Sequence, residues 1–416
     1  MSKLQPVRGS RDIWGEEARR QTYVVEKFSE ISKNFGFEEI STPIFEFTSV
    51  FQKTLGETSD VVSKEMYTFV DRGGDELTLR PEYTAGIARA YLSEGMQQKG
   101  VLKFYAHGPM FRYERPQKGR YRQFHQLDAE IIGAPEAAAD IEMIALGHQL
   151  LSALGIAGKT TLNLNSLGDM DSRTAYREAL VDYLSERKDK LSPESLDRLE
   201  RNPMRVLDSK DQGDQEVVAN APKLNDYLND ASREFFAEVQ AGLKNLGIPF
   251  VLNDHLVRGL DYYCHTTYEF ITEELGAQGA VIAGGRYDGL IGMMGGPETP
   301  GTGWAAGIDR LAMMIENFPE ARRGIVLVPV SEEAEKMAAR LCHDLRKGGL
   351  GADMAFRGNM KKRLQRANRQ NARWAVILGD DEMAEAAVTV RDLDSGDQET
   401  IKQDALLAFF SKASGD

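Results

Sequence analysis

The chain has 416 residues, of which 42% are hydrophobic and 28% are charged. This balance is that of an ordinary globular protein, and the length predicts two or three domains. The net charge of −13 argues against nucleic-acid binding by the whole surface, although a local basic patch can still bind it.

No segment of the sequence predicts export or membrane insertion. The start, MSKLQPVRGSRD, has no apolar signal-peptide core, and no run approaches the roughly 18 apolar residues of a membrane span. The only cysteines, Cys264 and Cys342, have no C-x-x-C partner. We therefore expect a cytoplasmic protein with free or buried thiols, without a disulfide or a protein-bound metal.

The first 132 residues predict an antiparallel sheet with helices beside it. Apolar residues at helical spacing predict a helix over about 16–35. The strand pattern at 37–46 is interrupted by Pro43, which favours a sheet edge or a bulge. Residues 77–92 predict a strand that leads into a helix. Three further strands are expected at 101–105, 111–115 and 121–132. Few helical crossovers separate these strands, so the predicted fold class is α+β rather than doubly wound.

The last of these strands has the most informative face. Side chains alternate along a strand, so one face carries a cation, a ring, an amide and two carboxylates. These residues are Arg122, Phe124, Gln126, Asp128 and Glu130. At about 3.4 Å per residue, Phe124 and Glu130 stand roughly 20 Å apart. That length suits a nucleotide laid along the strand, with a small cationic group at its far end.

The loop that precedes this strand is basic. Five cations lie within eleven residues and only Glu114 opposes them: Arg112, Arg115, Lys118, Arg120 and Arg122. Guanidinium groups match phosphate oxygens in bidentate geometry, so the loop predicts phosphate binding. The alternative is a charged hairpin exposed to solvent.

A helical module is predicted to interrupt the sheet. Residues from about 170 to 250 predict several helices, one of which starts with a Ser192 cap followed by Pro193. Strand patterns return at 256–272 and 279–290, so we expect the helices to be inserted into the sheet domain.

Two features near the returning strands could carry chemistry. Arg258 lies beside Gly259 and three positions before Asp261. It is either a structural ion-pair partner of Asp261 or a group that stabilises charge on a transferring phosphoryl group. Residues 301–306 satisfy G-x-G-x-x-A, but no strand precedes them and no acidic residue about 20 positions on completes a dinucleotide-binding unit. We expect instead a glycine-rich strand that enters a helix. Arg310 would lie near the helix N-terminus, where anions bind, or would be a simple surface cation.

The segment after Phe318-Pro319 alternates as βαβαβ, which predicts a small parallel α/β domain. Seven basic residues and no acidic one lie within 357–373. Four of them are spaced to share one helix face: Lys362, Arg366, Arg369 and Arg373. Such a run is usually a solvated face, but on an acidic chain it is the clearest sign of nucleic-acid binding.

Together these segments resemble the histidyl-tRNA synthetase family of class II aminoacyl-tRNA synthetases. FRYERPQKGRYRQFHQ resembles class motif 2, GWAAGIDRLAMM resembles motif 3, and the helix and strand ending at TPIFE resemble the dimer-forming motif 1. LVRGLDYY and AGGRYDGL resemble the family's histidine-binding signatures, and RGNMKKRLQRAN resembles part of its anticodon-binding domain. The resemblance implies a catalytic domain at 1–320 with a helical insertion at about 170–250, followed by an anticodon-binding α/β domain at 324–416.

The resemblance implies activation of histidine by ATP to histidyl-adenylate and transfer to the 3′ end of histidine tRNA. It also implies a homodimer, with Mg²⁺ accompanying ATP. The catalytic residues would be Arg112 and Arg258. ATP would also contact Arg120, Phe124 and Arg310. Histidine would be bound by Glu82, Thr84, Gln126, Glu130, Tyr262, Tyr263 and Tyr287. The tRNA would be bound by Lys362, Arg366 and Arg369.

Three positions depart from the family pattern. Tyr83 and Asp128 stand where glycine is frequent, and Asp309 stands where glutamate is usual. None removes an expected catalytic group. Because Tyr83 and Asp128 neighbour the expected ATP and histidine residues, we hypothesise that they alter contacts with the acceptor end of the tRNA.

Two other classes of protein remain as alternatives. A synthetase-like regulatory subunit would bind histidine without charging tRNA, but such paralogues lack the RGLDYY segment and the anticodon-binding domain. An oxidoreductase built on 301–306 would need a strand before its glycines, which the sequence does not predict.

Overall fold

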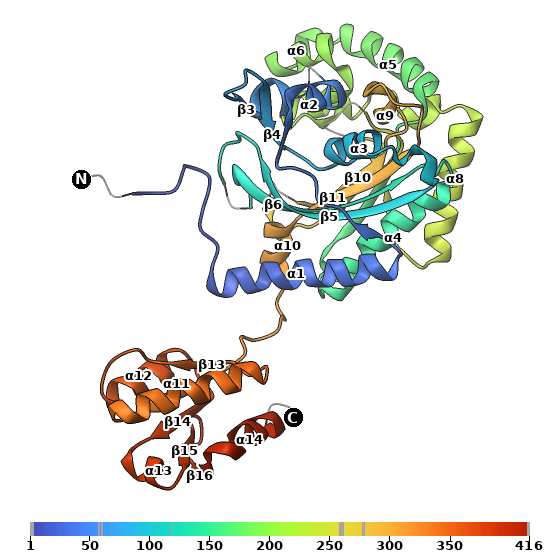
Figure 1. Ribbon diagram of the computed structural model, residues 1–416. Helices are drawn as coiled ribbons and strands as arrows, with labels where there is room; N and C mark the ends of the chain where they lie inside the picture. Colours follow the sequence, from blue (N-terminus) through green and yellow to red (C-terminus); the bar gives the residue numbers. More distant parts are fainter. Residues whose placement is uncertain are drawn as a thin grey trace. The chain divides into compact units, whose positions relative to one another are not determined.

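The computed structural model describes residues 4–56, 59, 61–117, 119–257, 262–276 and 279–413. The chain divides into two compact units, Met1–Phe318 and Pro319–Asp416 (Figure 1).

The first unit is built on an eight-stranded sheet in the order β1-β5-β6-β11-β10-β9-β7-β8. Its strands are β1 Glu38–Glu39, β5 Leu102–Phe111, β6 Gln123–Ile132, β7 Thr161–Ser166, β8 Val251–Leu252, β9 Cys264–Ile271, β10 Ala280–Arg286 and β11 Gly301–Gly307. Within the described ranges, the inner strands pair antiparallel and the short edge strands β1 and β8 pair parallel. The predicted α+β class with a largely antiparallel sheet is confirmed.

The hairpin of β5 and β6 differs in one respect from the expected strands. The segments expected at 101–105 and 111–115 are a single strand, β5, which ends at Phe111. Gly108 and Pro109 interrupt the alternation of apolar and polar residues and resemble a turn in the sequence. Both nevertheless remain paired with β6. The segment expected at 37–46 is split at Pro43, as the proline indicates, into β1 and a strand of another sheet.

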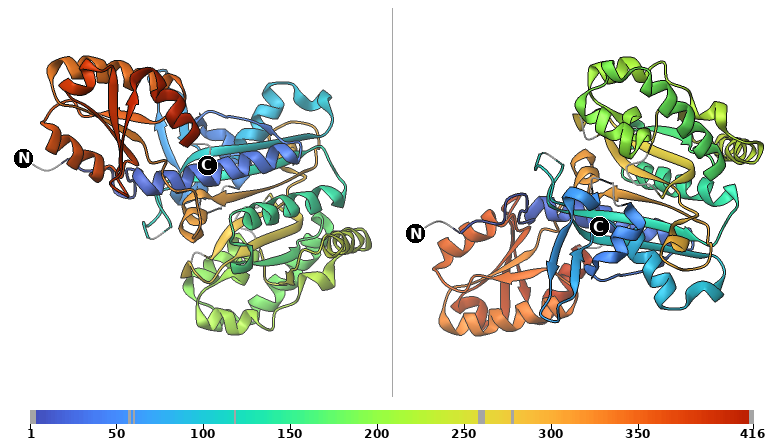
Figure 2. Two further views of the ribbon diagram at one scale, coloured as in Figure 1. Left: turned by 90° about the horizontal axis from the view of Figure 1, so that it is seen from below. Right: turned by 90° about the horizontal axis from the view of Figure 1, so that it is seen from above.

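Helices cover both faces of the large sheet (Figures 1 and 2). One face packs against α1 Gly15–Asn34, α4 Ala137–Ala153, α8 Asp230–Asn245 and α10 Ile308–Met314. The other face packs against α2 Thr48–Leu55, α3 Thr84–Ser93, α5 Met170–Ser185, α6 Pro193–Arg201, α7 Gln212–Val218 and α9 Leu290–Met293. Strand β6 contributes to both cores. Leu127, Ala129 and Ile131 belong to the first, and Ile132 belongs to the second.

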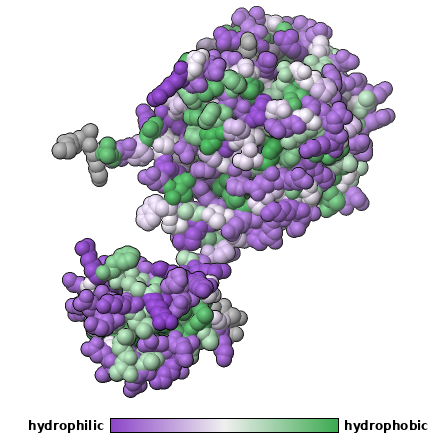
Figure 3. All heavy atoms as spheres, viewed as in Figure 1, coloured by the Kyte–Doolittle hydropathy of each residue, from purple (hydrophilic) through white to green (hydrophobic). Residues whose placement is uncertain are grey.

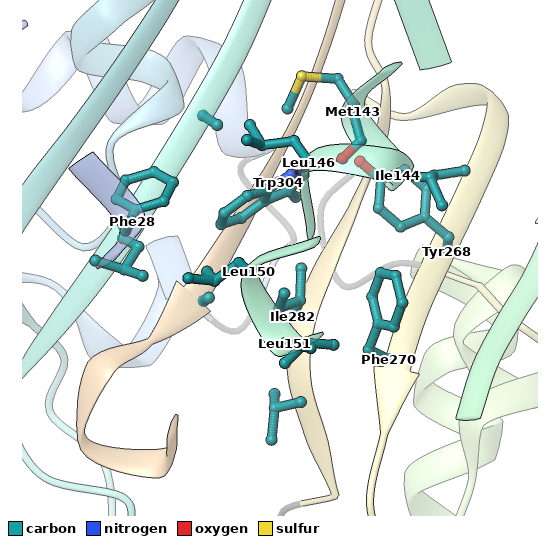
Figure 4. Close-up of a cluster of buried hydrophobic side chains, with 14 of the residues drawn as sticks. Phe28, Met143, Ile144, Leu146, Leu150, Leu151, Tyr268, Phe270, Ile282 and Trp304 are labelled. Carbon is teal, nitrogen blue, oxygen red and sulfur yellow. Dashed lines mark hydrogen bonds between the residues drawn. The ribbon is translucent and has the colours of Figure 1, made fainter. Parts of the chain in front are cut away.

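Trp304 of β11 anchors the first core. Its ring lies 5.4 Å from that of Phe28 in α1, and its indole N–H donates to the carbonyl of Met143 in α4 at 3.0 Å (Figure 4). Leu146 and Leu150 of α4 pack on the same side (Figure 4). Full burial of an indole needs such a partner for its N–H, so this bond fixes α4 on the sheet.

The helical module predicted at about 170–250 comprises α5 to α8. Ser192 caps α6, as predicted, by accepting a hydrogen bond from the backbone N–H of Ser195 at 3.2 Å. Asp214 of α7 holds this cap in place, because its carboxylate accepts from the hydroxyls of Ser192, Ser195 and Ser209 at 2.6–2.7 Å. These bonds lower the pKa of Asp214 against the effect of burial, which raises it.

A second, three-stranded sheet has the order β2-β4-β3, with β2 Phe45–Phe47, β3 Tyr67–Val70 and β4 Glu76–Leu79. The pairing register places six apolar side chains on one face: Phe45, Phe47, Tyr67, Phe69, Leu77 and Leu79. The rings of Phe45, Phe47 and Phe69 are 52%, 56% and 44% exposed. In Figure 3 hydrophobic surface gathers where Figure 1 places β3 and β4.

The second unit carries a five-stranded sheet in the order β13-β12-β14-β15-β16. Its elements are β12 Ile325–Pro329, α11 Glu332–Lys347, β13 Ala352–Met354, α12 Met360–Arg369, β14 Trp374–Leu378, α13 Asp380–Ala384, β15 Ala387–Asp392, β16 Gln398–Lys402 and α14 Leu406–Ala413. The predicted βαβαβ segment is confirmed as the parallel part, β12 to β14. The antiparallel strands β15 and β16 were not predicted.

No helix in the described part of the chain is long and apolar enough to cross a membrane. The thiols of Cys264 and Cys342 are both free.

Candidate active site

A pocket opens over β6, on the face that carries Phe124 and Gln126. Residues of the hairpin loop, β10, β11 and the N-termini of α3 and α10 line it. It brings together the arginines Arg112, Arg120 and Arg310 with Phe124. It also contains Glu82, Thr84, Gln126, Tyr262 and Tyr263. Arg258 and Lys118 lie outside the described residues.

Three guanidinium groups converge at one end of the pocket. The Nε atom of Arg112 donates to the carbonyl of Pro81 at 2.9 Å, and Arg310 donates to the carbonyls of Gly119 and Ala280 at 3.2 and 2.8 Å. Burial lowers the pKa of all three groups. The charges of Arg120 and Arg112 lower that of Arg310 further. Cations that are desolvated and repel one another are stabilised by an anionic ligand, so this end suits phosphate.

Phe124 lies beside this cluster. The guanidinium carbon of Arg112 is 5.6 Å from its ring centroid. A half-buried ring next to a cation offers a surface on which a planar base can stack.

Asp309 holds the start of α10 against β6 and the N-terminal segment. Its carboxylate accepts from Arg11 at 2.7 Å, from the amide of Gln21 at 3.0 Å and from the backbone N–H of His125 at 3.0 Å. Burial alone would raise the pKa of Asp309, but the interactions with the side chain and backbone N–H of His125 and with Arg11 outweigh burial and lower it. Arg11 also stacks on the ring of Tyr121, 4.2 Å from its centroid. Sequence reasoning missed Arg11 and Tyr121, and no local pattern marks them.

The opposite end of the pocket is built on the N-terminus of α3. The carboxylate of Glu82 accepts from the backbone N–H groups of Thr84 and Ala85 at 2.7 and 2.9 Å. The carboxylate of Glu82 therefore caps the N-terminus of α3. Burial raises the pKa of Glu82, while these two amides act in the opposite direction.

The hydroxyl of Thr84 is instead directed at Glu130. It donates to Oε1 of Glu130 at 2.6 Å, and the phenol of Tyr287 donates to Oε2 at 2.5 Å. Glu130 is 1% exposed, and burial raises its pKa to about 8. Tyr262 lies beside this group, with its ring 4.5 Å from that of Tyr263 and 5.8 Å from that of Tyr287.

Gly303 of β11 stands directly opposite Glu130 of β6. A Cβ atom at this position would lie 1.5 Å from Oε2 of Glu130. The glycine therefore provides the space that the carboxylate occupies.

Tyr83 and Asp128, two of the departures from the family pattern, are both buried, with 2% and 0% exposure. Tyr83 lies under the guanidinium group of Arg80, which donates to its hydroxyl at 2.9 Å and sits 4.2 Å above its ring. Because both side chains are buried, they would alter acceptor-end contacts only through the groups packed against them, and that hypothesis stays a prediction.

The basic segment of the second unit divides into exposed and structural residues. Lys362 and Arg369 are exposed on α12, and Arg366 is half-buried with Asp353 3.5 Å away. Arg363 is buried and pairs with Glu335. Arg373 lies beyond the end of α12 and pairs with Asp392 and Asp394, so its assignment to the same helix face is wrong.

An antiparallel sheet with an arginine-lined pocket beside a strand hairpin, joined to a separate α/β unit, fits the class II aminoacyl-tRNA synthetase type of enzyme that the sequence resembles. Family models agree: residues 9–311 match Histidyl-tRNA synthetase, and residues 324–413 match Anticodon binding domain.

Known proteins resemble the chain over its full length. A histidine–tRNA ligase of Rhodospirillum rubrum is 59% identical over 99% of this chain and 100% of its own. One of Gluconacetobacter diazotrophicus is 53% identical over 100% of both chains. The crystal structure of apo histidyl-tRNA synthetase of S. aureus matches with a TM-score of 0.82 and 33% identity, covering 99% of this chain and 100% of the other. The chain therefore belongs to the histidyl-tRNA synthetase family.

Proposed function

We propose that this pocket activates histidine with ATP to histidyl-adenylate and that the enzyme then transfers the histidyl group to the 3′ end of histidine tRNA. The convergence of three arginines at one end of β6, with a buried glutamate on the same strand face, carries the proposal. This arrangement can hold a nucleotide and an amino acid end to end, so that a carboxylate meets the α-phosphate.

The arginines take the phosphate end. Arg112 contacts the α-phosphate and offsets the charge that builds up as the carboxylate attacks. Arg258 is given the same role because its segment resembles the family's histidine-binding signature. Arg310 and Arg120 bind the remaining phosphates. Adenine stacks on Phe124, whose neighbour Arg112 is held by the Pro81 carbonyl.

Histidine occupies the other end. Glu82, Thr84 and Gln126 lie where the α-amino group binds, close to the N-terminus of α3. Glu130 binds a ring N–H of the imidazole, together with Tyr262, Tyr263 and Tyr287. Amino acids of similar shape that lack the imidazole N–H would leave these buried polar groups unpaired. The site therefore rejects them far more strongly than an apolar pocket would.

Mg²⁺ accompanies ATP in this proposal. The pocket carboxylates are already engaged, because Glu82 accepts backbone N–H groups, Glu114 pairs with Arg120 and Asp309 pairs with Arg11. This set fits an ion that is bound mainly by phosphate oxygens and water. When bound, the ion neutralises charge on the departing pyrophosphate.

Three further assignments complete the proposal. The enzyme works in the cytoplasm and binds the tRNA anticodon region through α12 of the second unit, using Lys362, Arg366 and Arg369. It forms a homodimer. The exposed aromatic face of the β2-β4-β3 sheet supports this, because a monomer rarely leaves such a face in water.

Histidine-dependent exchange of pyrophosphate into ATP tests the pocket assignment. Glu130→Gln should raise the KM for histidine and leave the KM for ATP unchanged, whereas Phe124→Ala should do the reverse. If either variant changes both constants equally, the division of the pocket into two ends is incorrect. Attachment of histidine to purified tRNA then tests the transfer step.

A further inference from the structure

Two carboxyl groups lie next to each other beneath the pocket, and only one of them receives hydrogen bonds from other side chains. Asp128 and Glu130 are two positions apart on the same face of β6, and both are buried. Glu130 accepts from Thr84 and Tyr287. Among the described residues, no N–H or O–H group donates to either oxygen of Asp128. The group it meets is the carboxyl of Glu130, within hydrogen-bonding reach.

The surroundings of Asp128 do not neutralise a charge on it. Its cross-strand neighbours are Ala106 of β5 and Ala305 of β11. The cation that acts on it is Arg80. The three nitrogens of that guanidinium group donate instead to Pro109, Thr42 and Tyr83. A buried carboxyl without donors or a paired cation takes up a proton rather than remaining charged.

We propose that Asp128 is a positioning residue whose protonated carboxyl donates a hydrogen bond to the carboxylate of Glu130 and leaves Glu130 with one acceptor position for a ring N–H of the substrate. A carboxylate offers about four acceptor positions, and Thr84, Tyr287 and Asp128 together fill three. The subsite then holds one negative charge instead of two. The inference rests on the proposed role of Glu130 in binding imidazole.

The proton should reside on Asp128 rather than on Glu130. Burial and the neighbouring Glu130 raise the pKa of Asp128 well above its ordinary value. Burial also raises the pKa of Glu130, to about 8, but Glu130 has hydrogen bonds from Thr84 and Tyr287 that favour its charged form, as does the contact with Asp128. The charged or titratable groups that act on Asp128 or respond to it are Glu130, Glu82, Arg80, Tyr83 and Tyr287. When Asp128 loses its proton at alkaline pH, two negative charges meet and the donor is lost, so histidine binding weakens.

Two substitutions of similar size separate this role from simple packing. Asp128→Asn keeps a neutral donor, so its KM for histidine in pyrophosphate exchange should stay within about threefold of wild type. Asp128→Leu fills the space without a donor, and its KM for histidine should rise about tenfold or more. The KM for ATP should be unchanged in both. Wild type should show a rise in the KM for histidine at alkaline pH that Asp128→Asn lacks.

Three results would overturn the inference. The KM for histidine could rise as much in Asp128→Asn as in Asp128→Leu, it could stay normal in Asp128→Leu, or its rise at alkaline pH could persist in Asp128→Asn. Should Asp128→Leu fail to fold, the pH profile of Asp128→Asn decides alone. Glu130→Gln separates this inference from the proposed function. If that variant leaves the KM for histidine unchanged, the imidazole subsite itself is misplaced. If Glu130→Gln raises the KM for histidine but the Asp128 variants leave it unchanged, the imidazole subsite is placed correctly and the proposed role of Asp128 is wrong.

Discussion

At the scale of single residues, the proposed histidine subsite needs the space left by a glycine as well as its polar groups. Glu130 can lie against β11 only because Gly303 has no side chain. The glycine-rich segment that resembles a dinucleotide fingerprint therefore has a different purpose. It lies in an antiparallel strand between β6 and β10, where it makes room for a buried carboxylate.

Gly303→Ala should damage histidine recognition. The added Cβ would displace the Glu130 carboxylate from Thr84 and Tyr287, so we expect the KM for histidine to rise at least tenfold. Overpacking of this kind also costs about 1–3 kcal/mol of stability. Gly292→Ala is the matched control, because a Cβ there meets no atom within 4 Å. Steady-state exchange and thermal unfolding of both variants check this, and a Gly303→Ala enzyme with normal KM would contradict it.

At the scale of elements, much of the site was predictable because it follows strand alternation. The face of β6 from Phe124 to Glu130 was read correctly from the period of two. The extent of β5 was not predicted, because a glycine and a proline interrupt its periodic pattern. The position of Arg373 was not predicted either, because the helix ends before it. The contact of Arg11 with Asp309 spans 298 positions, and no local pattern reports a pairing at that distance.

Asp309→Asn should loosen the junction of the N-terminal segment, α1, β6 and α10. Loss of charge-assisted bonds to Arg11 and Gln21 should cost about 2 kcal/mol at neutral pH. The folded-state pKa of Asp309 is lowered, so its stabilisation is present above the unfolded value of about 3.9 and is lost as pH falls through the folded value. The difference in Tm between wild type and Asp309→Asn should therefore be present at about pH 5 and shrink below about pH 4.

Thermal unfolding between pH 3.5 and 6.5 measures this difference. Asp12→Asn, at an exposed position one residue from Arg11, should leave Tm unchanged across the range. A gap between wild type and Asp309→Asn that does not narrow in acid would show that the carboxylate charge is not what joins these elements.

Helix α12 should contribute to tRNA binding through charge alone. Replacing Lys362 and Arg369 together by glutamine should weaken tRNA binding and reduce the slope of log affinity against log salt by about 1 to 2. Exchange activity should be spared, since that reaction needs no tRNA. The matched control replaces Arg340 and Lys347, two exposed cations of α11, by glutamine. Equal slopes for the two double variants would exclude a specific role for α12.

At the scale of the whole molecule, the small sheet is the feature that a single chain does not explain. Its aromatic face is exposed, whereas its other face is held to the unit by threonine hydroxyls, with Thr78 hydrogen-bonded to Thr48 at 2.9 Å. Exposed aromatic side chains on a regular strand face are what an interface between identical subunits uses.

Phe47→Asp combined with Phe69→Asp should therefore separate the proposed dimer into monomers. Two carboxylates placed in an apolar interface would be buried without partners on association, and both subunits would carry them. Val70→Asp is the matched control, because Val70 lies on the same strand, is 67% exposed and points to the opposite face from Phe69. Sedimentation equilibrium should give half the wild-type mass for the double variant and the full mass for the control. A wild-type protein that already sediments as a monomer would refute the dimer, and loss of the dimer in Val70→Asp would place the interface on another face of this sheet.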